Sequence, residues 1–370
     1  MKKVFSIITF LFYVALAQAQ TPVFYESFNQ CSGKTGWNGN LGENEPIFDN
    51  PGWSKTPEDP DGLVFAGNQC IRLGNTSSSK VTLKTPSINL KGSGFLIFKA
   101  GAWNTMSEKV NINIAIKGAR IIPNQQIDEF GNIKLIRGKF TVYKMQFETI
   151  EDSEDNIQIS FAAIAPKSNR FFLDEVEVYS TLPINISQLG YSTLATKLPY
   201  QLPEGITAYK VTENEDRSNI KIVALDRQII PAETGVLLKG EKGSYNANFV
   251  VNGGSAITDN ILRIQLTAGI VTPESNNQIY VLNTGPNGPG FYWQVEGGTS
   301  ANVGAGRCYL NINIPADQAA QGLNLDEGII STISEMQSIT KPTETYDLAG
   351  RRVQNLGRGL YIVNGKKVIR

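Results

Sequence analysis

Two acidic side chains occupy core-facing positions of predicted β-strands in the first half of the chain. Strand alternation places Glu26 on one face with Phe24 and Phe28. The same alternation places Asp174 on an apolar face with Val176. A buried carboxylate is costly unless it is paired or bound to a metal ion. Calcium is satisfied by carboxylates, backbone carbonyls and waters, so we predict one structural calcium ion shared by the first and last strands of this part.

Other arrangements would also accommodate the two acids. They are ion pairs with Lys or Arg, exposure at a strand end, or a β-bulge that turns the acid outward. Two carboxylates can also serve as the catalytic pair of a glycoside hydrolase. Nothing else in the sequence builds a saccharide cleft around Glu26 and Asp174. The structural calcium is therefore the preferred interpretation, and the hydrolase is the alternative.

The composition excludes several kinds of chemistry. The 370 residues include no histidine, which rules out Ser-His-Asp and Cys-His nucleophile pairs and His-ligated zinc or iron. We therefore expect a protein that is not an enzyme. The 34 Lys and Arg residues balance 34 Asp and Glu residues, so no excess of positive charge favours nucleic-acid binding.

The first nineteen residues have the organisation of a signal peptide. Lys2 and Lys3 form the positive start, residues 4–16 form the apolar stretch, and Ala17-Gln18-Ala19 gives a small-x-small cleavage pattern. The apolar stretch is shorter than the ~20 residues that span a bilayer. We predict cleavage before Gln20, no transmembrane segment thereafter, and an extracellular or outer-membrane surface location.

Three cysteines in an exported chain permit one disulfide bond. Cys31 and Cys70 lie in the same N-terminal segment, whereas Cys308 is far along the chain. Cys31–Cys70 is therefore the preferred pair, and three buried thiols are the open alternative.

The fold class follows from short apolar runs separated by turns. The chain has 35 glycines and 17 prolines and no long stretch of helical periodicity. We predict an all-β protein. A jelly-roll or β-sandwich occupies residues 20–182, a second, smaller β module 183–314, a linker 315–345 and a short β unit 346–370.

The N-terminal part resembles the cleaved-adhesin, MAM-like and carbohydrate-binding jelly-roll modules of Bacteroidetes surface proteins. The motifs that carry the resemblance are FYESF at 24–28, NGN at 38–40 and FFLDEV at 171–176. In such modules the Glu of the first strand and the Asp of the closing motif bind a structural calcium. The resemblance assigns that role to Glu26 and Asp174, with a backbone ligand near Asn68.

Aromatic side chains that could stack on a sugar are the next candidates, because they combine an apolar body with a polar tip. Trp37 and Trp53 stand in loops rich in Gly, Asn and Pro, and Trp103 follows a predicted strand. Asn104 and Arg170 could add polar contacts to a ligand. Packing in the core or in a loop is the alternative for each tryptophan.

The C-terminal residues resemble the sorting domain of the type IX secretion system. The matching motifs are D-x-x-G-x-x-V at Asp347, Gly350 and Val353, G-x-Y at Gly359 and Tyr361, and the basic pair Lys366 and Lys367. The Pro-Asn-Pro motif often found upstream is absent. The resemblance implies the secretion machinery as a partner, and a simple folded β cap is the alternative.

Together these features predict a secreted or cell-surface, non-catalytic binding protein or adhesin. Its N-terminal jelly roll would recognise a glycan or a host or matrix protein. The alternatives are a carboxylate-dependent glycoside hydrolase and a structural surface or fimbria-associated subunit.

Overall fold

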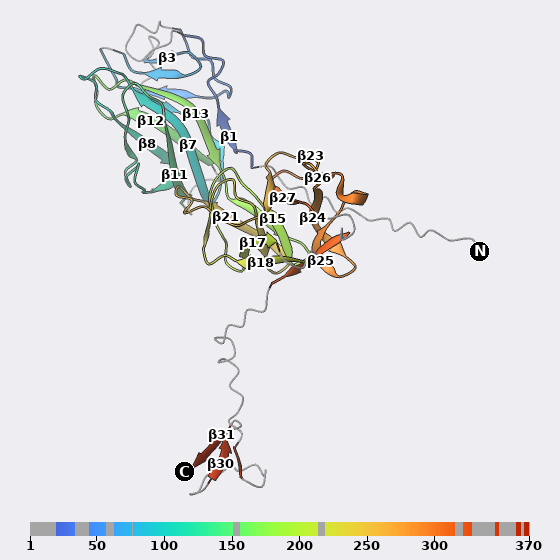
Figure 1. The fold of residues 1–370 in the computed structure, drawn as a ribbon. Coiled ribbons are helices and arrows are strands. Elements are labelled where there is room, and N and C mark those ends of the chain that lie inside the picture. Colours follow the sequence, from blue (N-terminus) through green and yellow to red (C-terminus); the bar gives the residue numbers. More distant parts are fainter. Residues whose placement is uncertain are drawn as a thin grey trace. The chain divides into compact units, whose positions relative to one another are not determined.

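The protein is all-β, as its sequence predicts (Figure 1). The computed structural model describes residues 20–33, 44–56, 63–75, 77–150, 156–213, 219–314 and 321–327, and strands at 345–347, 360–363 and 366–369. Over these ranges every regular element is a strand except for one short 3-10 turn, Glu296–Gly298. The chain divides into two compact units, Met1–Asp326 and Glu327–Arg370.

Two antiparallel sheets form the N-terminal sandwich. One has seven strands in the order β3-β4-β13-β7-β11-β9, with β1 paired to β13, and the other has six in the order β10-β8-β12-β5-β2, with β6 paired to β12. The bounds are β1 Phe24–Glu26, β2 Ser54–Thr56, β3 Val64–Ala66, β4 Ile71–Leu73, β5 Thr82–Lys84, β6 Ile88–Asn89, β7 Ser93–Ala102, β8 Asn111–Lys117, β9 Ala119–Ile122, β10 Asn132–Lys134, β11 Thr141–Thr149, β12 Asn156–Ala163 and β13 Phe171–Tyr179.

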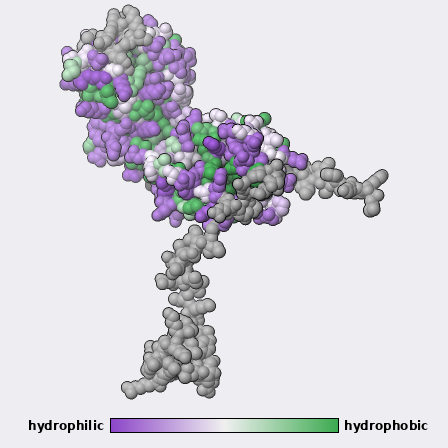
Figure 2. Space-filling model, viewed as in Figure 1, coloured by the Kyte–Doolittle hydropathy of each residue, from purple (hydrophilic) through white to green (hydrophobic). Residues whose placement is uncertain are grey.

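Alternating side chains fill the space between these sheets. On β8, Ile112 and Ile114 are buried while their neighbours on the strand are more exposed. Across the sandwich, the ring of Phe98 on β7 meets that of Phe161 on β12 edge to face at 5.3 Å. The sandwich thus has a continuous apolar core. On the visible face of the described parts, hydrophilic residues surround smaller hydrophobic areas (Figure 2).

The second part of this unit is built on a nine-stranded sheet of order β15-β20-β17-β18-β28-β25-β24-β27-β22, with a four-stranded sheet β14-β21-β16-β19 and a two-stranded sheet β23-β26. The bounds are β14 Leu182–Ile186, β15 Tyr191–Leu194, β16 Tyr200–Gln201, β17 Thr207–Glu213, β18 Asn219–Ala224, β19 Ile229–Ile230, β20 Val236–Lys239, β21 Gly243–Phe249, β22 Leu262–Gln265, β23 Gly269–Val271, β24 Gln278–Gly285, β25 Gly288–Tyr292, β26 Ala301–Val303, β27 Arg307–Ile312 and β28 Gly322–Asp326.

Strand β28 corrects one boundary, because it lies inside the predicted linker 315–345. It pairs in parallel with β18 and antiparallel with β25, so it belongs to the nine-stranded sheet. Leu323, the buried residue of this strand, packs in the core of the second part. The run is short and has only two apolar side chains, which is why it looks like linker.

The sandwich and the second part share an apolar cluster. The ring of Phe249 on β21 packs against Phe95 on β7 at 6.2 Å and against Tyr179 on β13 at 5.9 Å. All three side chains are buried, and they belong to the same cluster as Leu182 and Ile184 on β14. The side chains that join the two parts are therefore core residues.

The C-terminal unit contains a three-stranded antiparallel sheet. Its strands are β29 Thr345–Asp347, β30 Leu360–Val363 and β31 Lys366–Ile369. No helix in the described part of the chain is long and apolar enough to cross a membrane. The predicted signal peptide, residues 1–19, lies outside the described residues.

Candidate functional site

Glu26 is completely buried, and neutral donors compensate its charge. The backbone N–H groups of Asp49 and Asn50 donate to its two carboxylate oxygens at 2.7 and 3.1 Å. The side-chain amide of Asn50 adds a bond of 3.2 Å, and the indole N–H of Trp53 adds one of 2.9 Å. Oε2 accepts three of these four bonds and Oε1 accepts one, so both oxygens of Glu26 are hydrogen-bonded to neutral donors.

Trp53 holds this arrangement in place rather than offering a face to a ligand. Its ring stacks on Phe48 at 5.2 Å with an interplanar angle of 16°, and it also contacts Phe24 and Phe28. The side chain is partly buried and packs on the sandwich core. These contacts are those of the packing alternative for Trp53, and the ligand-binding role stays a prediction.

Asp174 lies on the opposite face of the sheet from Glu26. Leu173 and Val176 both point into the sandwich core, which is compatible with strand geometry because the pairing of β13 with β7 shifts register at this point. The bulge residue Glu175 has a φ of 46°. Asp174, which alternates with Leu173, therefore points outward, as in the bulge arrangement left open above.

The environment of Asp174 makes its carboxyl group easier to protonate than an ordinary aspartate. Burial, together with the neighbouring negative charge of Glu175, raises the pKa of this carboxyl group to about 6, against a weaker opposite effect of Lys99. Lys99 forms its ion pair with Glu175 instead, at 2.6 Å. Among the described residues, Asp174 thus forms no ion pair of its own.

The residues predicted for calcium do not fit one shared ion. Glu26 faces the core with both oxygens hydrogen-bonded to N–H groups, Asp174 faces outward, and Asn68 is exposed in the turn between β3 and β4. Among the described residues, no group of three His, Cys, Asp or Glu side chains is arranged to hold a metal ion. We therefore derive no role for calcium from this geometry.

The predicted Cys31–Cys70 disulfide is not formed. Cys31, Cys70 and Cys308 are all buried free thiols. Cys31 packs in the sandwich core and donates its S–H to the carbonyl of Ile47 at 3.2 Å, whereas Cys70 packs with Trp103 on the outer side of the sheet. Burial raises the pKa of Cys70 to about 12, so its thiol stays protonated.

The outer face of the seven-stranded sheet carries an unusual group of side chains, which we name the arginine–aromatic cluster: Arg72, Trp103, Glu108, Arg137 and Arg170. Trp103 stacks on Phe172 at 5.8 Å with an interplanar angle of 4°. The guanidinium of Arg170 lies 4.2 Å from the centre of the Trp103 ring, and that of Arg72 lies 5.7 Å from it.

Glu108 organises this cluster from the loop after β7. It is buried and forms an ion pair with Arg170, whose Nε donates to it at 2.6 Å and whose backbone N–H donates at 2.9 Å. Arg137 donates from Nη2 to the backbone carbonyl of Glu108. Bonds between Ala102 and the segment around Arg137 fix the two loops side by side. The cluster is thus held from several directions.

Two residues of this cluster were already candidates from the sequence. Trp103 and Arg170 were predicted as ligand-binding residues, and the structure brings them into contact. Trp103, however, is only 4% exposed and is not an open stacking platform. Arg72, Glu108 and Arg137 were missed, because only pairing between distant strands and loops brings them together. An arginine alternating with apolar residues in β4 was the one available signal.

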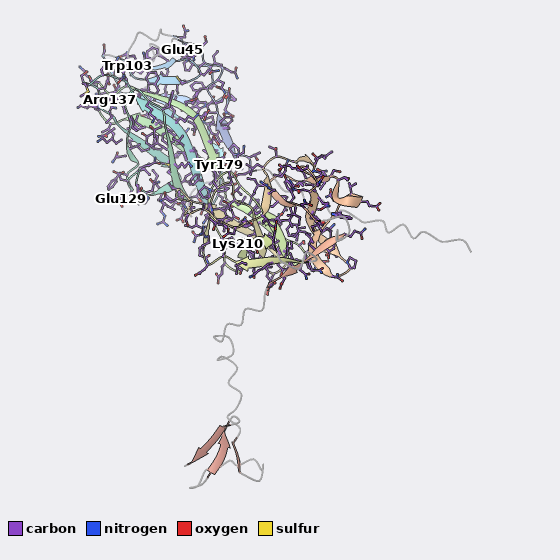
Figure 3. The ribbon with its side chains drawn as sticks, viewed as in Figure 1. Glu45, Trp103, Glu129, Arg137, Tyr179 and Lys210 are labelled. Atoms are coloured by element: carbon purple, nitrogen blue, oxygen red, sulfur yellow. The ribbon has the colours of Figure 1, made fainter. Side chains whose placement is uncertain are left out.

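The remaining predicted residues lie apart from these contacts. Asn104 is exposed beside Trp103 and packs on Gly138, where a Cβ atom would lie 2.9 Å from the side-chain amide carbon of Asn104. Trp37 lies outside the described residues. Trp103 and Arg137 lie at the same end of the sandwich (Figure 3).

No protein-family model matches the chain, and no curated protein matches it. Among solved structures, the chain is similar to the K3 cleaved adhesin domain of Lys-gingipain from Porphyromonas gingivalis w83. The two are 14% identical, the match covers 43% of this chain and 98% of that chain, and the TM-score is 0.31. At this identity the likeness concerns the fold alone.

Proposed function

We propose that this chain is an exported, non-catalytic binding protein that recognises an acidic glycan or an acidic surface of a host or matrix protein. The contact surface would be the sandwich end around the arginine–aromatic cluster. The observation that carries this proposal is Arg137. It is partly exposed, and no carboxylate of the described residues forms an ion pair with it.

The surroundings of Arg137 suit recognition of a carboxylate on a larger ligand. Asn104 provides an exposed amide, while Met106, 90% exposed, and Ile136, about half exposed, provide apolar surface. Arg is well suited to carboxylate groups because its planar N–H donors match two oxygens at once. The Glu108–Arg170 ion pair fixes the loop beneath this surface, so the surface is preformed.

A screen with acidic and neutral glycans and with matrix proteins tests the proposal on the full secreted chain. We expect binding to an acidic ligand, and we expect Arg137→Gln to weaken it by about tenfold, the scale of one lost charge-assisted bond. Arg120→Gln is the control, because Arg120 is an exposed arginine on β9 paired with Glu148. If Arg137→Gln and Arg120→Gln bind the acidic ligand with the same affinity, the proposal is contradicted.

The hydrolase alternative receives no support from Glu26. A catalytic carboxylate must reach the substrate, and both oxygens of this buried side chain accept bonds from neighbouring N–H groups. Release of reducing sugar from a bound glycan would favour the hydrolase. Self-assembly without any glycan or protein ligand would favour the structural-subunit alternative.

For the C-terminal unit we propose recognition by the secretion machinery. The support is the motif resemblance, with Tyr361 on β30 and the basic pair Lys366 and Lys367 on β31. A chain truncated after Asp326 tests this, since β28 and the sheet that contains it are kept. Retention of that chain inside the cell envelope is expected, and normal surface display would contradict the proposal.

A further inference from the structure

A cavity of about 200 Å³ opens in the second part of the chain, away from the arginine–aromatic cluster. Strands β14, β15, β20 and β27 line it, together with Gln20 from the segment before β1. Leu194 and Ile184 give it apolar walls, while Arg307 and Ser192 give it a polar side. None of these residues takes part in the function proposed above.

Arg307 is a largely buried cation without an anionic partner. Its Nη1 donates to Ser192 Oγ and, at 2.9 Å, to the carbonyl of Thr193, and both acceptors are neutral. It forms no ion pair with an acidic side chain of the described residues. A guanidinium has five N–H donors, so Nε and Nη2 keep donors that no described side chain uses. Burial lowers the pKa of Arg307, as expected for a charge without compensation.

Gln20 supplies a second unused donor in the same cavity. Its Oε1 accepts the backbone N–H of Lys197 at 2.9 Å, which fixes the orientation of the amide. The opposite atom, Nε2, is buried and has no hydrogen-bond partner. A buried donor without a partner is unfavourable by about 1–3 kcal/mol. Together with the N–H groups of Arg307 that no described side chain uses, this buried donor indicates a ligand that brings acceptors to the cavity.

We propose that this cavity binds a small carboxylate with a short apolar chain. The carboxylate would accept from Arg307 and from Gln20 Nε2, and the apolar chain would lie against Leu194 and Ile184. A single guanidinium matches the two oxygens of one carboxylate. The apolar walls favour an alkyl carboxylate over inorganic phosphate, which has nothing to place against them. The ligand is a free short-chain acid or the C-terminal carboxylate of a peptide.

Titration calorimetry on the full chain tests this with five probes: butyrate, butyramide, N-acetyl-Ala-Ala, its C-terminal amide, and inorganic phosphate. We expect saturable binding of at least one carboxylate and at least about tenfold weaker binding of its amide. Butyrate or the peptide, whichever binds more tightly, identifies the source. Absence of carboxylate binding at about 10 mM, where the free energy of binding would be below about 3 kcal/mol, overturns the proposal. Equal binding of the amide, or tighter binding of phosphate, also overturns it.

Two matched variants distinguish binding in the cavity from binding elsewhere on the protein surface. Arg307→Met removes the cation at similar length, and we expect it to weaken carboxylate binding by at least about tenfold. Arg263→Met is the matched control, because Arg263 is exposed on β22, the neighbour of β27, and does not line the cavity. If Arg307→Met does not fold, Gln20→Ala decides: a loss of about fivefold supports the site, and unchanged binding overturns it.

Discussion

Asp174 and Val176 lie on opposite faces of β13, although residues two positions apart in a regular strand share a face. The cause is the register shift between β13 and β7 and the positive φ of Glu175. Val176 is fully buried in the sandwich core, opposite Glu26 on β1. The bulge therefore separates the two carboxylates that strict alternation would place together.

Removal of calcium tests this separation. Because Glu26 is satisfied by four N–H donors and Asp174 points away from it, we expect EDTA to leave the melting temperature of the full chain within about 2 °C of its value in calcium. That corresponds to less than about 1 kcal/mol for a chain of this size. A large drop with EDTA, reversed by calcium but not by magnesium, would show that a calcium ion holds these strands.

The raised pKa of Asp174 predicts a pH-dependent stability. The folded state keeps the proton up to about pH 6, while the unfolded chain loses it near pH 4. The folded state binds more protons between these values, so the contribution of Asp174 to stability is highest below pH 4 and falls as pH rises to 6. The fall should be on the order of 1 kcal/mol, because the side chain is partly exposed and solvent screens its charge.

Asp174→Asn should remove this part of the pH profile. Urea denaturation at several pH values, with the wild type and the variant side by side, gives the comparison. The free energies of the two should converge near pH 4, and the variant should be the more stable above pH 6. A variant that is less stable at pH 7, especially in calcium, would mean that the charged carboxylate is the favoured form.

Replacement of Glu26 by Gln should destabilise the fold. The carboxylate accepts four N–H bonds, and an amide would turn its NH2 group toward some of those donors. We expect a loss of about 2–4 kcal/mol in the free energy of unfolding. Glu45→Gln, at an exposed position, should change it by less than about 0.5 kcal/mol. Similar values for the two variants would contradict the proposed role of Glu26.

The sequence was sufficient to predict the features of the fold that depend on a local pattern of apolar and polar residues. Alternation in β1 placed Glu26 on the core face correctly, since Glu26, Phe24 and Phe28 are all buried. Alternation failed at β13, because a bulge at Glu175 depends on pairing with β7 and has no local signal. Likewise, β28 gains its place only from β18, about a hundred residues earlier in the chain.

In the candidate sites, too, the sequence indicates individual residues, whereas contacts between distant segments decide their surroundings. The sequence proposed the tryptophans as ligand-binding residues, but only the fold shows what their rings contact: Trp53 contacts Phe48 and Glu26, and Trp103 contacts Phe172 and Arg170. These partners come from distant segments. Arg307 is recognisable as a cation without an ion pair only once the structure shows which described acidic side chains pair with other residues.

The three thiols give a direct chemical test of the missing disulfide. All three are buried, and burial raises the pKa of Cys70 and of Cys308 to about 12, so thiolate is scarce near pH 8. Ellman's reagent should find no fast-reacting thiol in the native chain and three in denaturant. A single thiol in denaturant would show that two of the cysteines are bonded after all, and mapping would identify the pair.

The final prediction concerns Phe249, which joins the sandwich to the second part. Its ring contacts Phe95 and Tyr179, and all three side chains are buried. Phe249→Ala removes these ring contacts and leaves a cavity, so we expect a loss of about 3–4 kcal/mol in the free energy of unfolding. Phe130→Ala is the control: Phe130 is 72% exposed, and its truncation should cost less than about 0.5 kcal/mol.

Tryptophan fluorescence in urea reports on both parts, since Trp53 and Trp103 lie in the sandwich and Trp293 in the second part. If this cluster couples the two parts, the variant should lower the unfolding midpoint of both. An effect limited to the second part would show that the cluster stabilises that part alone.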